Sequence, residues 1–265
     1  MKFNVKAFGF SIENANFLAR ASNLVYDDFN DPKFTSEIES WGFKKSNISF
    51  FDSRGTQAFL VVDQEKIIIA FRGTEPDQLK DWVTDAKVRK TAGPYGDVHR
   101  GFANALSYVW SDIENVIDEV RDNRQTIWLT GHSLGAALAT LATGAIQTNE
   151  EQIRVSGLYT FGSPRVGSHR FAKLFNQDNT HVYRFVNNSD IVTRVPLSQT
   201  YSHVGSLMYF NNDGELIPDK DLTWWNMFWD RMRGGLDSFL RLNPVDGITD
   251  HSMDKYEENI KNASR

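Results

Sequence analysis

The most constraining feature of the sequence is an abrupt change of pattern over residues 126–143, TIWLTGHSLGAALATLAT. A short run of β-formers stops at Gly-His-Ser-Leu-Gly, and small helix-forming residues follow at once. A turn this sharp leaves no room for side chains at Gly131 and Gly135, and it holds Ser133 in a strained backbone conformation. The junction predicts a buried strand, a serine raised at its end, and a helix packed closely on a sheet.

The five-residue pattern alone is weak evidence, since G-x-S-x-G occurs by chance in roughly one chain in ten of this length. The strand before it and the helix after it are the context of a nucleophile elbow. The helix would also point the N–H groups of its first turn towards the reacting centre. We therefore interpret Ser133 as a catalytic nucleophile.

The pattern around this junction predicts an α/β protein. Residues 59–62 and 66–71 form an expected hairpin, and helical spacing covers residues 11–28 and 105–122. From about residue 100, strands alternate with helices, which favours crossover connections and a central, mostly parallel sheet flanked by helices. Further strands are expected within 155–164, 181–190 and 203–211, a helix within 169–177, and a helical tail after residue 251. No repeat or low-complexity linker interrupts residues 1–265, so we expect a single domain.

Composition excludes several classes of protein. The net charge of -5 argues against a nucleic-acid partner. The absence of cysteine excludes disulfides, a thiolate nucleophile and cysteine-based zinc sites. No metal-ligand spacing such as HExxH occurs, and the serine chemistry indicated by the motifs needs neither a metal nor an organic cofactor. No apolar run is long enough to span a bilayer, and the N-terminus lacks a signal-peptide pattern. We expect a cytoplasmic chain, or one exported by another route or after its signal is removed; the pattern does not indicate an oligomeric state.

A serine nucleophile needs a base, and the base needs an orienting carboxylate; in hydrolases of this kind the order is Ser, Asp or Glu, then His. Four histidines follow the serine: His169, His181, His203 and His251. We favour His251, which lies in an irregular stretch late in the chain, over His203, whose place at the head of a strand is typical of a structural histidine. Asp190 follows a strand end and is the expected acid. Asp250 is a poor orienter because side chains of adjacent residues usually point apart.

The oxyanion of an ester intermediate needs two preorganised donors. One is the backbone N–H of Leu134, the residue after the nucleophile. The other is expected from a loop after an earlier strand. The apolar strand ending at Arg72-Gly73-Thr74 offers the N–H of Thr74, whereas Arg72 is expected to make structural hydrogen bonds.

Several segments together resemble one known family, the class 3 lipases, which are fungal-type triacylglycerol lipases of the α/β-hydrolase fold. The matching segments, in order, are AFRGT, DWVTDAKV, VHRGFANAL, LTGHSLGAALA, YTFGSPRVG, NNSDIVTRVP and DHSMDKY. They run from about Phe59 to Tyr256. The resemblance implies a triad of Ser133, Asp190 and His251, an oxyanion hole at Thr74 and Leu134, and structural roles for His99 and Arg165.

The resemblance also implies a lid over residues 75–90, where apolar residues recur at helical spacing. Such a helix can expose its apolar face at a lipid–water interface, giving transient contact with lipid. A fixed surface helix, or a segment leading into a strand, is the alternative. The tryptophan-rich residues 222–242 are a departure from the fungal pattern, and we expect two short helices there. They either cap an acyl pocket or form a surface that touches the membrane, or they simply pack beneath the loop of His251.

These observations predict a serine carboxylic ester hydrolase, a lipase that cleaves acylglycerol esters through an acyl-enzyme. A phospholipase A1 and a short-chain carboxylesterase are the nearest alternatives. A catalytically inactive signalling or scaffold module is the alternative from another class. The secreted fungal members carry disulfides, so the lack of cysteine points to a bacterial-type or intracellular relative.

Overall fold

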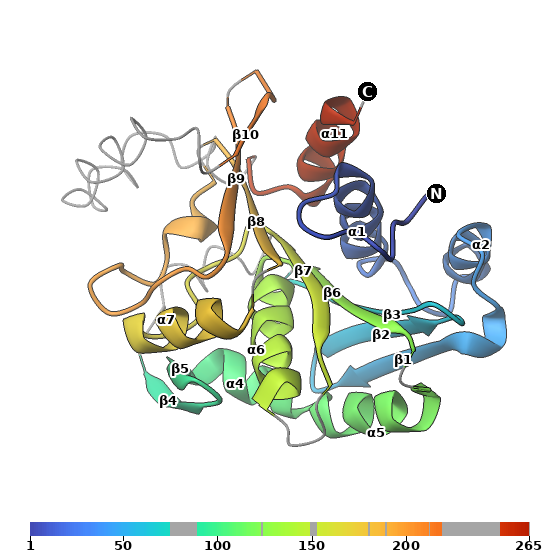
Figure 1. The fold of residues 1–265 in the computed structure, drawn as a ribbon, viewed down its shortest axis with the longest axis horizontal. Helices are drawn as coiled ribbons and strands as arrows, with labels where there is room; N and C mark the ends of the chain where they lie inside the picture. Colours follow the sequence, from blue (N-terminus) through green and yellow to red (C-terminus); the bar gives the residue numbers. More distant parts are fainter. Residues whose placement is uncertain are drawn as a thin grey trace.

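A computed structural model of the chain describes residues 1–74, 89–122, 124–148, 153–179, 181–188, 190–211, 213–218 and 250–264. Its centre is an eight-stranded sheet with the order β1-β2-β3-β6-β7-β8-β9-β10 (Figure 1). The strands are β1 (Ile48–Ser53), β2 (Thr56–Val62), β3 (Lys66–Phe71), β6 (Thr126–His132), β7 (Val155–Phe161), β8 (Val182–Asn187), β9 (Ser206–Phe210) and β10 (Leu216–Pro218).

The middle of this sheet is parallel, as the alternating pattern predicts. Strands β3, β6, β7, β8 and β9 pair in parallel with one another in sheet order. The antiparallel pairs lie at the edges, where β1 and β2 precede β3 and where β10 returns along β9. The expected hairpin over residues 59–71 is confirmed as the β2–β3 pair.

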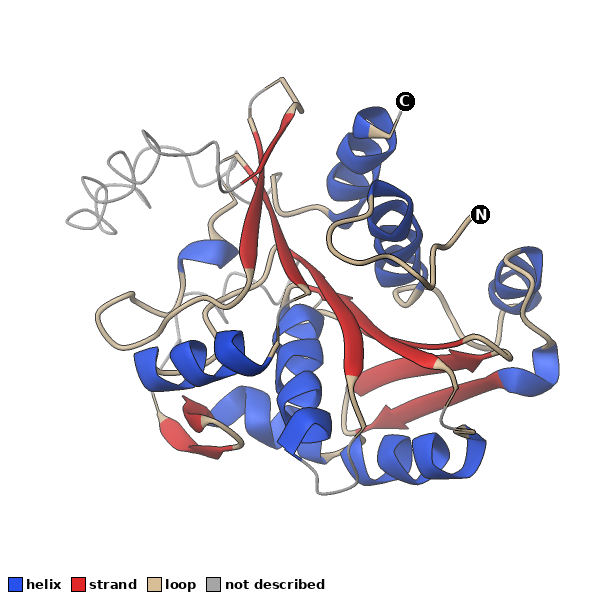
Figure 2. Ribbon diagram, in the orientation of Figure 1, coloured by secondary structure: helices blue, strands red, loops and turns tan. Residues whose placement is uncertain are grey.

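Helices cover both faces of the sheet, and Figure 2 shows the strands running between the two helical layers. One layer consists of α4 (Arg100–Ser107), α5 (Trp110–Val120), α6 (Leu134–Thr148) and α7 (His169–Asp178). The other consists of α1 (Ile12–Leu24), α2 (Pro32–Ser40) and α11 (Met253–Ala263). Each layer buries its own apolar cluster against the sheet. The expected α/β architecture, with helices on both faces of the sheet, is confirmed.

Burial explains why these segments form these elements. All six residues of β3 are buried, as expected for a strand covered on both faces. Helix α6 is almost entirely buried, and its small residues let it lie close on the sheet. Side-chain caps start other helices: Ser11 accepts the N–H of Asn14 at α1, and Ser168 accepts that of Phe171 at α7.

Two local features differ from the sequence-based expectation. The single helix expected over 105–122 is two helices, α4 and α5, separated at Tyr108 and Val109. Neither residue is a helix breaker, and the apolar periodicity continues across the break, so the local pattern contains no signal for it. A small antiparallel pair, β4 (Lys90–Gly93) and β5 (Gly96–His99), was also not expected.

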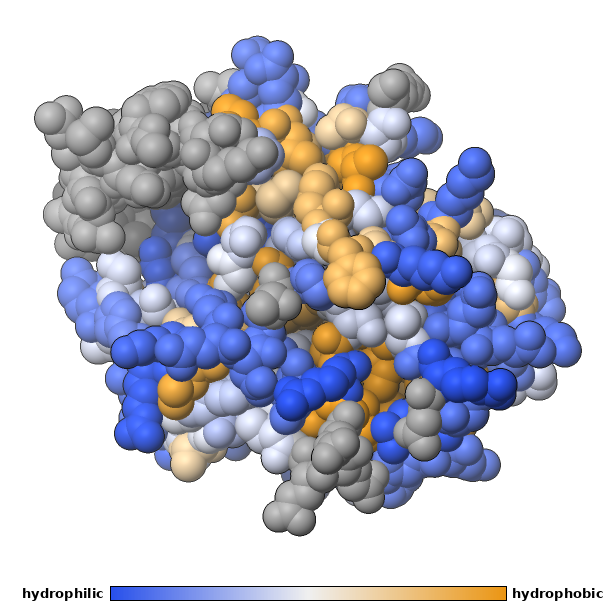
Figure 3. Space-filling view, viewed as in Figure 1, coloured by the Kyte–Doolittle hydropathy of each residue, from blue (hydrophilic) through white to orange (hydrophobic). Residues whose placement is uncertain are grey.

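Hydrophilic side chains cover most of the coloured part of the face drawn in Figure 3, with smaller apolar groups between them. Within the described ranges, no helix is both long enough and apolar enough to cross a bilayer.

Candidate active site

The turn between β6 and α6 has the strained geometry that its sequence predicts. Ser133 has a φ of 57°, in the left-handed region that non-glycine residues rarely occupy. A methyl carbon at Gly131 would lie 2.4 Å from the carbonyl carbon of Gly135, and one at Gly135 would lie 2.1 Å from the carbonyl oxygen of Phe71. Both glycines are therefore required by close approach of main chain to main chain.

The strand next to this turn brings the C-terminal histidine to the serine. The N–H of Ser133 donates to the carbonyl of Phe161 at 3.0 Å, at the end of β7. The next residue, Gly162, has a φ of 59°, and a methyl carbon there would lie 2.8 Å from the ring of His251. The rings of His132 and His251 lie 4.4 Å apart between centroids. His251 therefore lies against the residues on either side of the nucleophile turn.

Asp190 holds the histidine ring from the other side. His251 Nδ1 lies 2.9 Å from Asp190 Oδ2 and 3.0 Å from Oδ1. The Tyr256 hydroxyl donates to Oδ2 at 2.6 Å, and the N–H of Val192 donates to Oδ1 at 2.9 Å. Burial, together with the nearby Asp190 carboxylate, raises the pKa of Tyr256 well above 10, so its hydroxyl keeps the proton that it donates.

The two atoms that a triad would use for chemistry are buried and have no hydrogen-bond partner among the described residues. Ser133 and Asp190 are fully buried, and His251 is nearly so. Within the described part of the chain, neither Ser133 Oγ nor His251 Nε2 has a hydrogen-bond partner. The two atoms are therefore not hydrogen-bonded to each other in this structure. Since buried polar atoms are usually paired, an unpaired hydroxyl and an unpaired imidazole nitrogen in one region are typical of a functional site.

The loop after β3 passes beside the nucleophile. A methyl carbon at Gly73 would lie 3.1 Å from Ser133 Cβ and 2.5 Å from the carbonyl oxygen of His132. Thr74 follows in this loop, and Leu134 is the first residue of α6. The two expected oxyanion donors are thus carried by segments that meet at the serine.

Sequence reasoning missed a second layer of the site. The carbonyl of His251 accepts from His132 Nε2 at 2.6 Å, so the ring carries its proton there, and Nδ1 accepts from the Tyr26 hydroxyl at 2.8 Å. Burial lowers the pKa of His132 well below 6.5, which keeps this ring neutral. Tyr26 also fills the space that a side chain at Gly73 would need. The only signal for His132 was its place inside the GHSLG motif.

The rival candidates have other partners. His203 donates from Nε2 to the carbonyl of Thr193 at 2.7 Å, and Asp250 pairs with Lys255. His169 is exposed at the start of α7. His251 and Asp190 therefore stay the predicted base and acid.

The residues expected to be structural make structural contacts. Arg72 contacts Gln57 and lies over the ring of Tyr26. Arg165 donates to the carbonyls of Arg194 and Pro196.

Two expected segments cannot be compared with the structure. Residues 75–88 of the expected lid, and the whole aromatic segment 222–242, lie outside the described residues. Among the residues that are described, no group of three or more His, Cys, Asp or Glu side chains is placed to hold a metal ion.

Comparison with known proteins places this geometry in a family. The family model described as "Lipase (class 3)" matches residues 68–200, which is half of the chain and includes the serine turn and Asp190. The chain belongs to the class 3 lipases. The resemblance in the sequence motifs is thereby confirmed.

Two relatives of this chain have different named activities. A triacylglycerol lipase of Arabidopsis thaliana is 28% identical over 72% of this chain and 48% of its own length. A chloroplastic phospholipase A(1) of the same plant is 33% identical over 70% of this chain and 46% of its own length. The chain thus spans about half the length of the curated relatives it matches.

A solved structure confirms the fold of this chain. The triacylglyceride lipase of Rhizomucor miehei superposes with a TM-score of 0.64 at 24% identity, covering 78% of this chain and 82% of that chain. At this level of identity the likeness shows the α/β-hydrolase fold alone.

Proposed function

We propose that this chain is a serine carboxylic ester hydrolase that cleaves acylglycerol esters through an acyl-enzyme. The observation that carries the proposal is a strained, buried Ser133 whose preceding residue, His132, has its ring 4.4 Å from the ring of His251, and a His251 Nδ1 that lies 2.9 Å from the buried Asp190 carboxylate. The family and its lipase relatives support the choice of an acylglycerol substrate.

In the proposed mechanism Ser133 Oγ attacks the ester carbonyl carbon while His251 Nε2 takes the hydroxyl proton. The carbonyl π bond opens to a tetrahedral oxyanion, which the N–H groups of Leu134 and Thr74 stabilise. Asp190 fixes the ring so that Nε2 is the basic nitrogen, and its negative charge stabilises the imidazolium.

Collapse of the intermediate breaks the bond to the alcohol oxygen, which leaves with the proton from His251. Water then attacks the acyl-enzyme, gives its proton to His251, and forms a second tetrahedral intermediate. When this collapses, the fatty acid leaves and the proton returns to Ser133. No metal or organic cofactor enters these steps.

A phospholipase A1 activity is the second candidate. It is supported by the 33% identity to a phospholipase A(1) over 70% of this chain. The two activities share every catalytic step. They differ only in what the third glycerol position of the substrate carries, which is an acyl chain in triacylglycerol and a phosphate headgroup in a phospholipid. A short-chain carboxylesterase would use the same steps on soluble substrates.

Hydrolysis of p-nitrophenyl esters tests the proposal. Ser133→Ala and His251→Ala should each lower kcat by about 10⁴-fold or more, because the members of a triad act as a unit. His203→Ala is the matched control and should keep its turnover. Retained activity in Ser133→Ala would assign the chemistry to another serine, and a wild-type protein without turnover on any ester would favour the inactive module.

The substrate class is tested with the same protein. Rates on triacylglycerol, on phosphatidylcholine and on short soluble esters should rank in favour of triacylglycerol. A higher rate on the phospholipid, with cleavage at one acyl position, would instead assign the phospholipase.

A further inference from the structure

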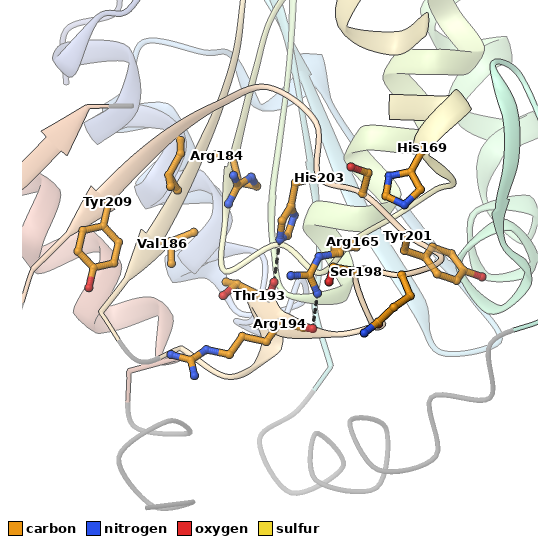
Figure 4. Close-up of a pocket in the computed structure, with 13 residues that line it drawn as sticks. Arg165, His169, Arg184, Val186, Thr193, Arg194, Ser198, Tyr201, His203 and Tyr209 are labelled. Atoms are coloured by element: carbon orange, nitrogen blue, oxygen red, sulfur yellow. Dashed lines mark hydrogen bonds between the residues drawn. The ribbon is translucent and has the colours of Figure 1, made fainter. Parts of the chain in front are cut away.

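Asn187, the last residue of β8, has a buried side chain that no step of the proposed mechanism uses. Its direction follows from strand alternation. Arg184 and Val186 line a cavity on one face of β8, as Figure 4 shows, so Asn187 points to the other face, against α11. The residue is 1% exposed there. An amide buried to this degree needs partners for its donor and acceptor groups, and these partners show what it holds in place.

The side chain of Asn187 connects α11 to the loop that carries the predicted base. Its Nδ2 donates to the carbonyl of Asp250 at 3.1 Å, and its Oδ1 accepts from Asn259 Nδ2 of α11 at 3.1 Å. The Asp250 carbonyl and the N–H of His251 belong to one peptide group. Because a peptide group is planar, a bond to this carbonyl also restrains the direction in which the chain enters His251.

The main chain of Asn187 makes corresponding bonds on the side of the predicted acid. Its carbonyl accepts from the N–H of Asp190 at 2.8 Å, and its N–H donates to the Tyr256 hydroxyl at 2.9 Å. That hydroxyl donates in turn to Asp190 Oδ2. The two main-chain and two side-chain polar groups of Asn187 are therefore all bonded to the segments that carry Asp190 and His251.

The proposed triad depends on such a connection, because Asp190 and His251 are 61 positions apart in the chain. A displacement of about 1 Å in a catalytic group can cost about 10²-fold in rate. The carbonyl of His251 is held by His132 Nε2 at 2.6 Å, and the preceding carbonyl is held by Asn187. We propose that Asn187 is a positioning residue that keeps His251 at hydrogen-bond distance from Asp190. This role rests on the proposed function, because it serves the proposed triad.

Replacement of Asn187 by leucine removes the amide and nearly keeps its size. For a p-nitrophenyl ester, kcat should fall about tenfold or more while KM changes less than about twofold, because the loss affects the transition state and not substrate binding. Asn179→Leu is the matched control. Asn179 is also buried, its Nδ2 also donates to a carbonyl, that of Phe175, and its Oδ1 also accepts from a side-chain amide, that of Gln147. It precedes β8 instead of ending it, so its replacement should lower stability in urea without lowering kcat.

The proton NMR signal of the His251 Nδ1–H group is a readout that needs no substrate. A hydrogen bond to a carboxylate moves such a signal far downfield, and its absence in His251→Ala assigns it. The signal should move upfield or broaden in Asn187→Leu and stay in place in Asn179→Leu. It can be recorded even for a protein that hydrolyses no ester, so a failure of the proposed function and a failure of this proposal are distinguishable. A wild-type protein without the signal would overturn the proposal.

A second pair of variants decides the result if Asn187→Leu does not fold. Asn259→Ala removes only the donor to Asn187 Oδ1, from a half-buried side chain. It should lower kcat about threefold, as expected for the loss of one neutral hydrogen bond, and move the His251 signal in the same direction. Asn262→Ala, the same change at an exposed position of α11, should alter neither. An unchanged signal, an unchanged kcat, or an equal loss of kcat in the matched control would overturn the proposal.

Discussion

At the scale of single residues, hydrogen bonds orient the side chains around the site, and two polar atoms there have no hydrogen-bond partner within the described structure. The buried Asp190 accepts from His251, Tyr256 and the N–H of Val192, so its carboxylate is held in one orientation. The backbone of His251 is in turn held by His132. Only Ser133 Oγ and His251 Nε2 remain open among these atoms. Preorganisation of this kind lets the dipoles stabilise charge without rearranging.

Replacement of Tyr256 by phenylalanine tests this orientation. The variant loses the hydrogen bond to the Asp190 carboxylate, a type worth about 1.5–3 kcal/mol, so kcat should fall about tenfold or more on a p-nitrophenyl ester. Tyr159→Phe is the matched control, because both tyrosines are fully buried and each hydroxyl accepts one backbone N–H, from Asn187 at Tyr256 and from Ser11 at Tyr159. It should lose stability without losing kcat. Equal changes of kcat in both variants would mean that Tyr256 acts only through packing.

At the scale of elements, the site depends on how closely α6 approaches β3. The first turn of α6 lies against the end of β3, where Gly135 approaches the carbonyl of Phe71. A flexible side chain can move away from an added methyl group, but the main chain at Phe71 cannot. The loop at Gly73, which follows β3, also lies against Ser133, so the packing of a helix on a strand would set the geometry of the proposed oxyanion hole.

Alanine at Gly135 should therefore cost more than about 3 kcal/mol of unfolding free energy, or prevent folding. The control is Gly144→Ala in the same helix, where the new methyl carbon would meet only side-chain atoms, at 3.5 Å or more. That change should stabilise the protein by about 0.5–1 kcal/mol, because alanine is the better helix former. Both values come from urea unfolding, and a small loss for Gly135→Ala would show that α6 can shift away from β3.

Elements with a strong local pattern could be predicted from the sequence. The β2–β3 hairpin, the β6–α6 junction and the parallel centre of the sheet have clear periodicity, and the structure confirms them. The break between α4 and α5 and the β4–β5 pair depend on tertiary packing, which the pattern of a short stretch of sequence does not contain. Likewise, the approach of Tyr26 and Tyr256 to the site joins residues far apart in the sequence.

At the scale of the whole molecule, the protein keeps several histidines neutral inside its layers. Burial is the main cause that lowers the pKa of His99, His132 and His203. Above pH 6.5 these residues are neutral in both states and have no effect on stability. Below it they bind protons in the unfolded chain but not in the folded one, so the free energy of unfolding decreases as the pH falls.

Urea unfolding at pH 7.5 and pH 5 should show this decrease directly. Each buried neutral histidine contributes up to about 1.4 kcal/mol per pH unit below 6.5. His203→Gln keeps a donor for the Thr193 carbonyl but cannot titrate, so its stability should depend less on pH. His169→Gln, at an exposed position, should behave as the wild type. An unchanged slope in His203→Gln would mean that this ring is protonated in the folded protein.

Covalent labelling with a p-nitrophenyl alkylphosphonate measures the central claim most directly, because only an activated serine displaces p-nitrophenol from it. The account predicts one adduct per chain, located at Ser133 by peptide mass spectrometry, and none in Ser133→Ala or His251→Ala. An adduct on any other residue, or a wild-type protein that hydrolyses esters without being labelled at Ser133, would contradict it.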